Sequence, residues 1–399
     1  MEHASKTIAI IGAGASGCLC AYFLLNNLNN KISPHPNPPP IKGGNIDVTL
    51  FDKGSPLRTL LPTGGGRCNL AHAEYDFREL AKNYPRGEKF LYSIFSKYST
   101  AETLETFQEM GINCYTQENG RIFPESNSAK NVREIILNKI GNANIVKEEV
   151  INLTRIENGF KLKTNKAEYL FSDVILATGG HSGYKIAENL GIKIIEPKPS
   201  LVGLNTKENF KILSGTVIKG SKCNGVFDDL LFTHFGISGP LIYTISSIKA
   251  FDKMPYKLNI DLAPELVDLQ KDLNIYPHKE IKNILNKYLP QKVASFILQD
   301  VVSENTKAHK INGKTRDLIL ERIHNFEIEV IGTNKGEETV TAGGIDLNEI
   351  NPKTMEVKEV PNLYAIGEVL NIDGFCGGFN LQNAWSTAYI CAEKAKKTF

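Results

Sequence analysis

The fold is decided by a short stretch near the start of the chain, Thr7-Ile8-Ala9-Ile10-Ile11-Gly12-Ala13-Gly14-Ala15-Ser16-Gly17. Its first five residues predict a buried strand, and an uncharged, helix-like run through Leu25 follows the glycines. In such a strand–turn–helix unit, Gly12 permits the tight turn, Gly14 lets the backbone approach a pyrophosphate, and Gly17 lets helix and strand pack closely. The pattern predicts a dinucleotide site at residues 12–17, with the amides of the helix N-terminus facing the phosphates.

A site of this kind normally has an acidic residue at the end of the second strand, where it holds the ribose hydroxyls. Here the candidate is Asp52, which follows the strand-like run Ile46–Phe51 and precedes Lys53. The spacing from Gly17 is longer than usual because of Asn29–Asn45, which contains five prolines and cannot form a helix or a central strand. We interpret that segment as an inserted surface loop, and Asp52 and Lys53 as cofactor-binding residues.

Two later segments repeat the pattern of a strand followed by glycine. Val174–Ala177 runs into Thr178-Gly179-Gly180 after short alternating runs at residues 145–171, and Leu363–Ile366 runs into Gly367-Glu368. A β-meander that delivers such a strand is typical of FAD domains. The cofactor-binding candidates in these segments and in the last helix are Val150, Thr178, Gly179, Gly367, Glu368, Asn380 and Leu381.

The last helix is predicted to open at Gly377-Gly378-Phe379-Asn380-Leu381-Gln382. The dipole of its N-terminus would lie against the flavin pyrimidine carbonyl, which gains negative charge on reduction. The two ends of the chain would then build one site. The sequence has no second G-x-G-x-x-G and no C-x-x-C, and so no visible NAD(P)H-binding domain or redox disulfide.

Composition excludes several classes of protein. The chain has 399 residues, 41% hydrophobic and 23% charged, which is ordinary for a soluble globular protein of two or three domains. The formal net charge of +2 gives no strong attraction to nucleic acid or anionic membrane. Seven dispersed cysteines fit a reducing compartment. The uncharged run Ile8–Leu25 contains three glycines and lacks a basic leader, which disfavours a membrane segment or a signal peptide.

Three residues are candidates for catalysis: Arg67, Arg121 and His234. Arg67 follows Gly64-Gly65-Gly66, so Gly66 and Arg67 either approach a phosphate or the reduced flavin or belong to a flexible loop. Arg121 either lines a substrate cavity or lies in a turn before a helix near Ser128. His234 is either an acid, a base or a substrate anchor, or a structural histidine.

The remaining candidates are weaker. Cys68 is interpreted as a small packed residue rather than a reactive one. His72 and His181 are minor candidates for a chemical role. No spacing typical of a metal site or of a serine hydrolase is present.

The middle of the chain changes character twice. Residues 196–262 contain several glycines and prolines between short β-like runs, which is typical of a barrel or sandwich, and residues 263–323 show helical spacing. Another strand-like run begins at Phe326. We therefore predict an FAD-binding domain at 1–195 and 336–399, with an inserted middle domain at 196–335 that is β-rich at 196–262 and 324–335 and helical at 263–323.

Several motifs agree in order with a known family. They are Gly12–Gly17, Thr63–Leu70, Gly120–Pro124, Leu231–Pro240, Thr341–Ile345, and Gly367–Leu370 with Asp373-Gly374. Together they resemble the BaiN-like bacterial flavoproteins, the family that includes aminoacetone oxidase, and they nearly span the chain. Where that family commonly has a Thr-Asn pair, this chain has Ala71-His72, and the glycine-rich stretch after Gly180 is shortened to His181–Tyr184.

The resemblance implies a noncovalent FAD, an α/β fold with a Rossmann-like, glutathione-reductase-like FAD domain, and an inserted β-barrel-like and helical part. We expect an FAD-dependent oxidoreductase in which a small organic substrate between the middle domain and the isoalloxazine exchanges a hydride with flavin N5. The redox partner is either O2, as in an aminoacetone oxidase, or a transient NAD(P)H.

Two other hypotheses stay open, an RNA-modification-associated flavoprotein and a non-catalytic flavin sensor. No nucleic-acid or membrane partner is expected, a cytoplasmic location is expected, and the oligomeric state is open.

Overall fold

The computed structural model describes residues 6–26, 46–180, 182–334, 336 and 340–397. These residues form two compact units, which we call unit 1 (residues 1–197 and 341–399) and unit 2 (residues 198–340). Each unit has its own hydrophobic core. The proline-rich segment 29–45 and His181, both singled out in the sequence, lie outside the described residues.

Unit 1 is built on a parallel five-stranded sheet in the order β19-β10-β1-β2-β6. Its strands are β1 (Lys6–Ile11), β2 (Ile46–Phe51), β6 (Asn144–Val146), β10 (Asp173–Leu176) and β19 (Leu363–Ala365). All four residues of β10 and most of β1 are buried, as expected of strands covered on both faces. The carboxyl ends of β1, β10 and β19 therefore meet at one edge, where a parallel sheet binds its ligands.

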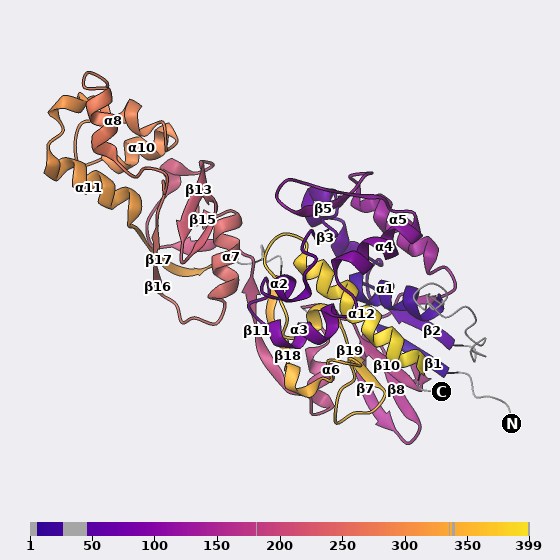
Figure 1. The fold of residues 1–399 in the computed structure, drawn as a ribbon. Coiled ribbons are helices and arrows are strands. Elements are labelled where there is room, and N and C mark those ends of the chain that lie inside the picture. Colours follow the sequence, from indigo (N-terminus) through magenta and orange to yellow (C-terminus); the bar gives the residue numbers. More distant parts are fainter. Residues whose placement is uncertain (1–5, 27–45, 181, 335, 337–339, 398–399) are drawn as a thin grey trace. The chain divides into compact units, whose positions relative to one another are not determined.

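Two helices from opposite ends of the chain pack side by side in unit 1 (Figure 1). They are α1 (Ala15–Leu25) and α12 (Phe379–Lys397). Trp385 of α12 is fully buried, meets Phe107 edge-on with ring centres 5.4 Å apart, and donates Nε1–H to the Leu70 carbonyl at 2.9 Å. The last helix thereby anchors the segment around Leu70.

Substitution of Trp385 by Phe tests that anchor. The ring would remain in the core, but the Leu70 carbonyl would lose its buried donor, which costs about 1–3 kcal/mol. We expect urea unfolding, followed by circular dichroism, to show a loss of unfolding free energy of that size. A Tyr115→Phe variant, whose hydroxyl makes an exposed bond to Asn127, is the control and should change little. Equal stability of the Trp385→Phe variant and the wild type would contradict the anchor.

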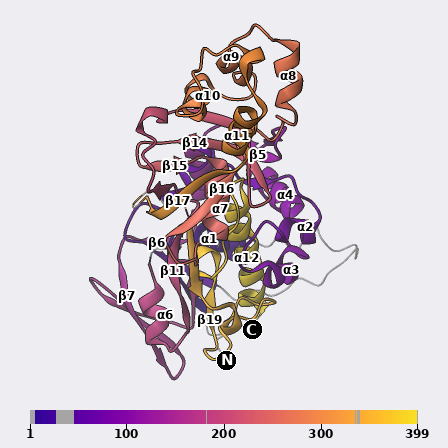
Figure 2. The ribbon, with the colours of Figure 1, turned by 90° about the vertical axis from the view of Figure 1, so that its left-hand side faces the viewer.

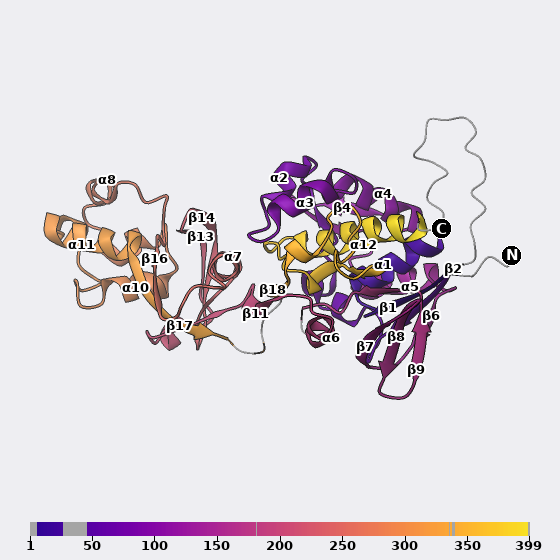
Figure 3. The same ribbon diagram turned by 90° about the horizontal axis from the view of Figure 1, so that it is seen from below.

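The rest of unit 1 surrounds this core with short elements. The helices are α2 (Phe77–Ala81), α3 (Glu88–Phe95), α4 (Thr100–Met110), α5 (Ala129–Lys139) and α6 (Tyr184–Asn189). A small antiparallel sheet contains β3 (Ala71–His72), β5 (Arg121–Pro124) and β4 (Cys114–Thr116). A three-stranded meander contains β7 (Val150–Ile156), β8 (Gly159–Thr164) and β9 (Glu168–Phe171), and it is seen well in Figure 3.

The chain leaves and re-enters unit 1 along two paired strands, β11 (Ile194–Ser200) and β18 (Val340–Ile345). Gly343 has a φ of +97°, and a Cβ there would lie 2.7 Å from the Glu196 carbonyl oxygen, so the two backbones approach closely. The departure and the return of the chain are thus held together by one two-stranded ribbon.

Unit 2 contains an antiparallel six-stranded sheet in the order β13-β14-β15-β12-β17-β16. Of its strands, Figure 2 labels β14, β15, β16 and β17. The strands are β12 (Leu204–Thr206), β13 (Val217–Cys223), β14 (Val226–Phe232), β15 (Gly236–Ser238), β16 (Tyr256–Ile260) and β17 (Phe326–Thr333). Lys222 and Asp261 exchange two backbone hydrogen bonds of 2.8 Å, which join the two edges of the sheet. The sheet is therefore curled into a barrel-like form.

Among the described residues of unit 2, four helices lie in sequence between β16 and β17, and a fifth lies between β15 and β16. The four are α8 (Leu269–Ile275), α9 (Ile281–Leu285), α10 (Gln291–Leu298) and α11 (Gly313–His324). The fifth, α7 (Pro240–Ile248), packs on β14 inside the segment 196–262, which was predicted to be β-rich and which also contains strands β12 to β16. Pro240 occupies the first helical turn, where its missing N–H costs nothing, and Leu241 and Ile245 share a buried face.

Short 3-10 turns complete the fold. They are η2 (Arg58–Leu60), η3 (Thr63–Gly66), η4 (Lys211–Leu213), η5 (Ala308–Lys310), η6 (Leu347–Glu349) and η7 (Gly367–Val369). Among the described residues, no helix combines the length and apolar character needed to cross a bilayer. The predicted fold class, an α/β Rossmann-type domain with an inserted, curled antiparallel sheet and helices, is confirmed.

Candidate functional site

The turn between β1 and α1 is shaped by its three glycines. A Cβ on Gly12, whose φ is +107°, would lie 2.2 Å from the Ala177 carbonyl oxygen at the end of β10, and a Cβ on Gly17 would lie 2.0 Å from the Gly12 carbonyl oxygen. Glycine at both positions is thus required by the protein's own packing. A Cβ on Gly14 would meet no atom within 4 Å. The space in front of Gly14 is therefore open to a ligand.

Among the residues that the structure describes, polar groups without a protein partner occur at the start of α1 and at the end of β10. The N-cap of α1 is Gly14, which supplies no side-chain hydrogen bond, so the first-turn amides after Ala13 keep their capacity to bind an anion. The Thr178 Oγ1 at the end of β10 is buried and makes no hydrogen bond within the described residues. A buried hydroxyl without a partner is costly unless a ligand satisfies it.

Asp52 lies at the end of β2 and already binds the protein backbone. Its Oδ2 accepts the Ala13 N–H at 2.9 Å, and its Oδ1 accepts the Gly54 N–H at 2.7 Å. Each carboxylate oxygen has a second lone pair, so the same group can also accept a ribose hydroxyl. Lys53 pairs with Glu149 at 3.2 Å, with both side chains exposed, and this pair brings Val150 at the start of β7 to the end of β2.

The C-terminal part of the chain meets the same turn. A Cβ on Gly367, whose φ is +72°, would lie 2.5 Å from Ser16 Oγ at the start of α1. Glu368 accepts the Thr341 N–H at 2.9 Å, and a Cβ on Gly180 would lie 2.7 Å from the same carboxylate oxygen. The structure thus brings residues 12–17, 178–180 and 367–368 together, as the sequence analysis expected of a site built from both chain ends.

Residues of α12 that the sequence analysis did not single out extend this cradle. The Gly367 N–H donates to Thr387 Oγ1 at 3.0 Å, so this face of α12 lies against the end of β19. Asn383, one turn earlier on the same face, is 2% exposed, and its Oδ1 makes no hydrogen bond within the described residues. No short motif marks Asn383, because only the burial of α12 distinguishes it from other helical asparagines.

Asn380 and Leu381 were predicted to bind the cofactor. The structure gives Asn380 another role, because its side chain exchanges two hydrogen bonds of 2.8 Å with the backbone of Gly374. Leu381 is partly buried in the core of unit 1. Asn380 thus fixes the loop that precedes α12.

The same loop is held by a largely buried ion pair that no sequence motif indicates. The Arg86 guanidinium makes a two-pronged contact with the fully buried Asp373 carboxylate. In addition, Tyr84 donates its hydroxyl to the Phe379 carbonyl at 2.6 Å. Nothing in the sequence links residues nearly three hundred positions apart, so only the structure reveals this clamp.

The glycine loop Thr63–Arg67 forms η3 and the residue after it. Gly64, Gly65 and Gly66 all have positive φ, and a Cβ on Gly65 would point into open space. Arg67 donates Nε–H to the Gly64 carbonyl at 3.1 Å and lies 4.1 Å over the Phe123 ring. Cys68 is fully buried, and burial raises the pKa of its thiol to about 12, as suits a packed residue rather than a nucleophile.

Arg121 lies on β5, so this segment is a strand rather than the turn that was one of the two alternatives. Phe123 lies two residues further along β5 and therefore on the same face as Arg121, which places Arg67 on that face too. The Arg121 Nη2 donates to the Cys376 sulfur at 4.0 Å. On β3, His72 pairs with Arg121, and its Nδ1–H donates to the Gly377 carbonyl at 3.1 Å.

His234 belongs to unit 2. It is exposed in the turn between β14 and β15 and contacts Phe235 edge-on, with ring centres 5.2 Å apart. The residues that build the cradle all belong to unit 1. A catalytic role for His234 stays a prediction.

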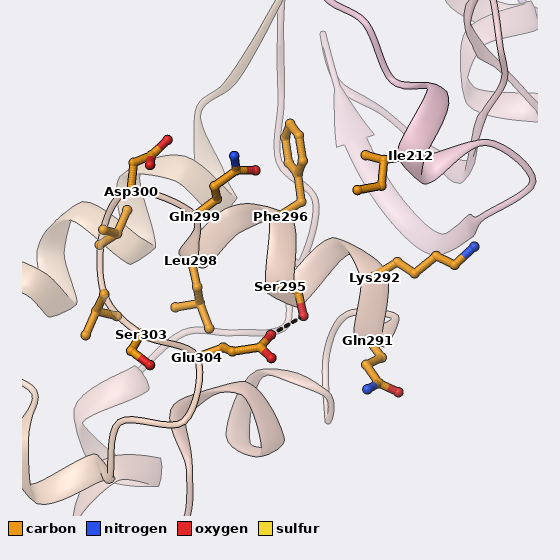
Figure 4. Close-up of a pocket in the computed structure, with 12 residues that line it drawn as sticks. Ile212, Gln291, Lys292, Ser295, Phe296, Leu298, Gln299, Asp300, Ser303 and Glu304 are labelled. Carbon is orange, nitrogen blue, oxygen red and sulfur yellow. Dashed lines mark hydrogen bonds between the residues drawn. The ribbon is translucent and has the colours of Figure 1, made fainter.

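Unit 2 also carries a pocket of about 720 Å³ beside α10 (Figure 4). Apolar side chains such as Phe296 and Ile212 line it, together with the hydrogen-bonded pair Ser295 and Glu304, whose oxygens are 2.6 Å apart. It contains none of the predicted site residues. Among the described residues, no cluster of histidine, cysteine, aspartate and glutamate suited to a metal ion occurs.

The residues of unit 1 fit a bound FAD. The open space at Gly14, the uncapped start of α1 and the buried Thr178 hydroxyl suit the pyrophosphate and its neighbouring hydroxyls. Asp52 and Lys53 occupy the place where the adenosine ribose would be held. Asn383 and the loop before α12 continue the same cradle toward Arg121 and Arg67.

The known proteins that are similar to this chain include three that match it over nearly its whole length. A family model described as the HI0933-like protein Rossmann domain matches residues 40–394. The chain is 33% identical to a Haemophilus influenzae protein named ribosomal RNA dihydrouridine synthase, over 98% of each chain, and 29% identical to an Escherichia coli protein of that name, over 96% of each. It is 26% identical to a Clostridium scindens protein named 3-dehydro-bile acid delta(4,6)-reductase, over 97% of this chain and 98% of the other.

Solved structures with a similar fold include the open conformation of a flavocytochrome c3 fumarate reductase. The match has a TM-score of 0.49 and 12% identity, and covers 98% of this chain and 78% of the other.

Proposed function

This chain belongs to the HI0933-like family, consistent with its predicted resemblance to BaiN-like flavoproteins, and from that premise we propose that it reduces a carbon–carbon double bond conjugated with a carbonyl group. It is an FAD-dependent oxidoreductase. When bound, FAD supplies the hydride chemistry, and the chain's own residues bind the cofactor, orient it and supply protons. The first substrate to be tested is uridine in ribosomal RNA.

The observation that carries this proposal is the cradle at the edge of the parallel sheet. The space where a Cβ of Gly14 would lie is open to a pyrophosphate, whereas protein atoms fill the corresponding space at Gly12 and Gly17. The turn is therefore shaped for a ligand rather than merely flexible. Arg67 and Arg121 place positive charge on one face of β5. Positive charge of this kind favours the electron-rich form of a flavin and an oxygen that gains negative charge in the substrate.

The names of the relatives support the reaction type. Dihydrouridine is uridine with its C5–C6 double bond reduced, and a delta(4,6)-reductase acts on ring double bonds, so both names denote the reduction of a carbon–carbon double bond. In uridine and in a 3-oxo steroid, a carbonyl is conjugated with that bond and accepts the charge that hydride addition creates. The chain spans nearly the full length of these relatives.

The uridine substrate goes against the expectation from charge. The net charge of +2 predicts no general attraction to RNA. Modification of one base needs local contacts with that base, and base contacts rather than phosphate contacts provide such specificity. We propose NAD(P)H as the transient electron donor, because a reductase needs an external source of hydride.

The test uses the purified protein without oxygen. We expect a yellow protein that NADH or NADPH bleaches, and that regains its colour when ribosomal RNA is added from an E. coli strain lacking its own relative. Mass spectrometry should then find dihydrouridine in that RNA. RNA from the parent strain, which already carries any product of the E. coli relative, is the matched control.

Other outcomes separate the alternatives. Recovery of colour with a 3-oxo-delta(4,6) steroid alone would keep the reaction and replace the substrate. If no double-bond substrate restores the yellow colour and aminoacetone bleaches the flavin, the protein is an amine oxidase and the proposal is overturned. A colourless protein that takes up no added FAD would contradict the cofactor assignment on which the proposal rests.

A further inference from the structure

Cys376 has a position that the proposed function does not yet explain. It is the exposed cysteine of the chain, whereas five of the other six are buried and Cys114 is half-buried. It lies in the loop directly before Gly377, Gly378 and the N-terminus of α12, and the Arg121 guanidinium contacts its sulfur at 4.0 Å. An exposed thiol beside a cation suits chemistry better than packing.

The backbone around Cys376 is held from three sides. Asn380 bonds twice to Gly374, Arg86 clamps Asp373, and the imidazole of His72 bonds to the Gly377 carbonyl. A Cβ on Gly378 would lie 2.4 Å from the Ala71 carbonyl oxygen, so the turn after Cys376 is closely packed as well. The thiol is therefore presented from a fixed backbone, as a group that must meet a substrate atom requires.

One face of α12 connects this thiol with the cofactor cradle. Thr387 on that face contacts Gly367, which touches Ser16 at the start of α1. Asn383 lies one turn closer to the helix N-terminus, is 98% buried, and has an amide oxygen without a partner among the described residues. A ligand group that binds the Asn383 amide oxygen would lie between the phosphate end of the cradle and Phe379, the helical residue nearest to Cys376 in sequence. The helix rises about 12 Å from Thr387 to Phe379.

The other titratable group at this place is poorly suited to give up a proton. Burial and the charge of Arg121 lower the pKa of His72 by more than its hydrogen bond to Gly377 raises it, so the ring is neutral at pH 7. Its Nδ1–H is used by the Gly377 carbonyl, and Nε2 faces Gly120, where a Cβ would lie 2.5 Å away. His72 stacks on Phe379 and supports the loop.

From these contacts we infer that Cys376 is the proton donor of the reaction, an inference that rests on the proposed double-bond reduction. The hydride, supplied ultimately by NAD(P)H, forms a C–H bond at one carbon, and the double-bond electrons move toward the conjugated carbonyl. The Cys376 S–H bond breaks as its proton joins the neighbouring carbon. The resulting thiolate is stabilised by Arg121 and takes a proton back from water.

Thiol chemistry gives a test that needs no turnover. Iodoacetamide should alkylate one thiol rapidly, and peptide mass spectrometry should place it at Cys376, because five of the other six cysteines are buried and Cys114 is half-buried. The pH profile of that rate should move to higher pH in Arg121→Gln and return toward wild type in Arg121→Lys, since the nearby cation favours the thiolate. The other charged or titratable groups around this loop include His72, Glu74, Arg67, Tyr84 and the buried pair Arg86 and Asp373, and His72→Gln serves as a second control for the profile.

The redox test separates the two half-reactions. In Cys376→Ala and Cys376→Ser, bleaching of the flavin by NAD(P)H should stay within about twofold of wild type, because that step needs no proton from the thiol. Reoxidation by the double-bond substrate should slow by about 10²–10⁴-fold, the usual contribution of a general acid. The matched control is Cys114→Ala in β4, which should reoxidise at the wild-type rate.

The outcomes of the redox test distinguish a failure of the inference about Cys376 from a failure of the proposed function. Reoxidation of Cys376→Ala at the wild-type rate overturns the inference and leaves the proposed function intact. A wild-type flavin that no double-bond substrate reoxidises overturns the proposed function and this inference together. Equal slowing of both half-reactions also overturns it, since Cys376 would then support the fold of the loop rather than donate a proton.

Discussion

A Gly14→Val variant should fold like the wild type and fail to hold FAD. The new side chain would project into the space where no protein atom lies within 4 Å, so it meets the cofactor rather than the chain. Gly14 has φ −79° and ψ −164°, an extended conformation that valine adopts readily. Loss of a favoured N-cap glycine costs about 1 kcal/mol. We expect FAD affinity to fall by about 100-fold or more, which corresponds to about 2.7 kcal/mol.

The neighbouring glycines provide the contrast. Gly12→Ala and Gly17→Ala would press a methyl group to within 2.2 Å and 2.0 Å of backbone carbonyl oxygens, so both should destabilise the fold itself. Gly313→Val, at the start of α11 in unit 2, is the matched control. Its Cβ would meet only the end of Arg316 at 4.0 Å, and FAD binding should be unchanged.

The measurement is a titration of apoprotein with FAD, followed by quenching of flavin fluorescence, together with urea unfolding. Stability near wild type with lost affinity supports the position of the pyrophosphate at this turn. Wild-type affinity in Gly14→Val would show that the cofactor does not approach Gly14.

The second large effect concerns the Arg86–Asp373 clamp. Asp373→Ala should lower the free energy of unfolding by about 3–5 kcal/mol, because it removes the buried carboxylate that pairs with a largely buried guanidinium. The Asp373 side chain is fully buried and that of Arg86 is only 13% exposed, so water cannot replace the lost contact. The loop before α12 should loosen as well, and bound flavin should be released at a lower urea concentration than in the wild type.

An exposed pair serves as the control for that variant. Lys257 and Glu327 lie 2.7 Å apart with side chains 61% and 55% exposed, so solvent screens the pair and Glu327→Ala should lower the unfolding free energy far less than Asp373→Ala. Urea unfolding followed by circular dichroism and by flavin fluorescence reports both quantities. Similar small losses of unfolding free energy in the two variants would mean that the Arg86–Asp373 pair does not stabilise the fold.

Much of unit 1 could be predicted from the sequence because its signals are local. The strand, the three glycines and the helix of residues 6–25 follow each other directly, and β10 and β19 repeat an apolar strand that ends in glycine. Helix α7 could not be predicted from its own residues, because its isoleucines and threonine are typical of strands, while packing against β14 favours a helix.

The parts of the site that depend on distant residues could not be predicted. Asp52 has the right residue type at the right strand end, but its bonds to Ala13 and Gly54 follow from how the turns meet. Cys376 and Arg121 come together only because β5 lies beside the loop before α12. Asn383 matters because its amide oxygen is buried without a partner, and burial at a single helical position leaves no motif.

The way in which unit 2 interrupts unit 1 affects how the chain folds during synthesis. Unit 2 is continuous in sequence, whereas unit 1 needs β19 and α12, which are made after unit 2. At 5–20 residues per second, a ribosome needs about 7–30 s to make residues 198–340. For that time the edge of β10 has no neighbour and α1 lacks its partner helix. Nascent chains stalled after residue 340 should therefore bind general chaperones and hold no flavin.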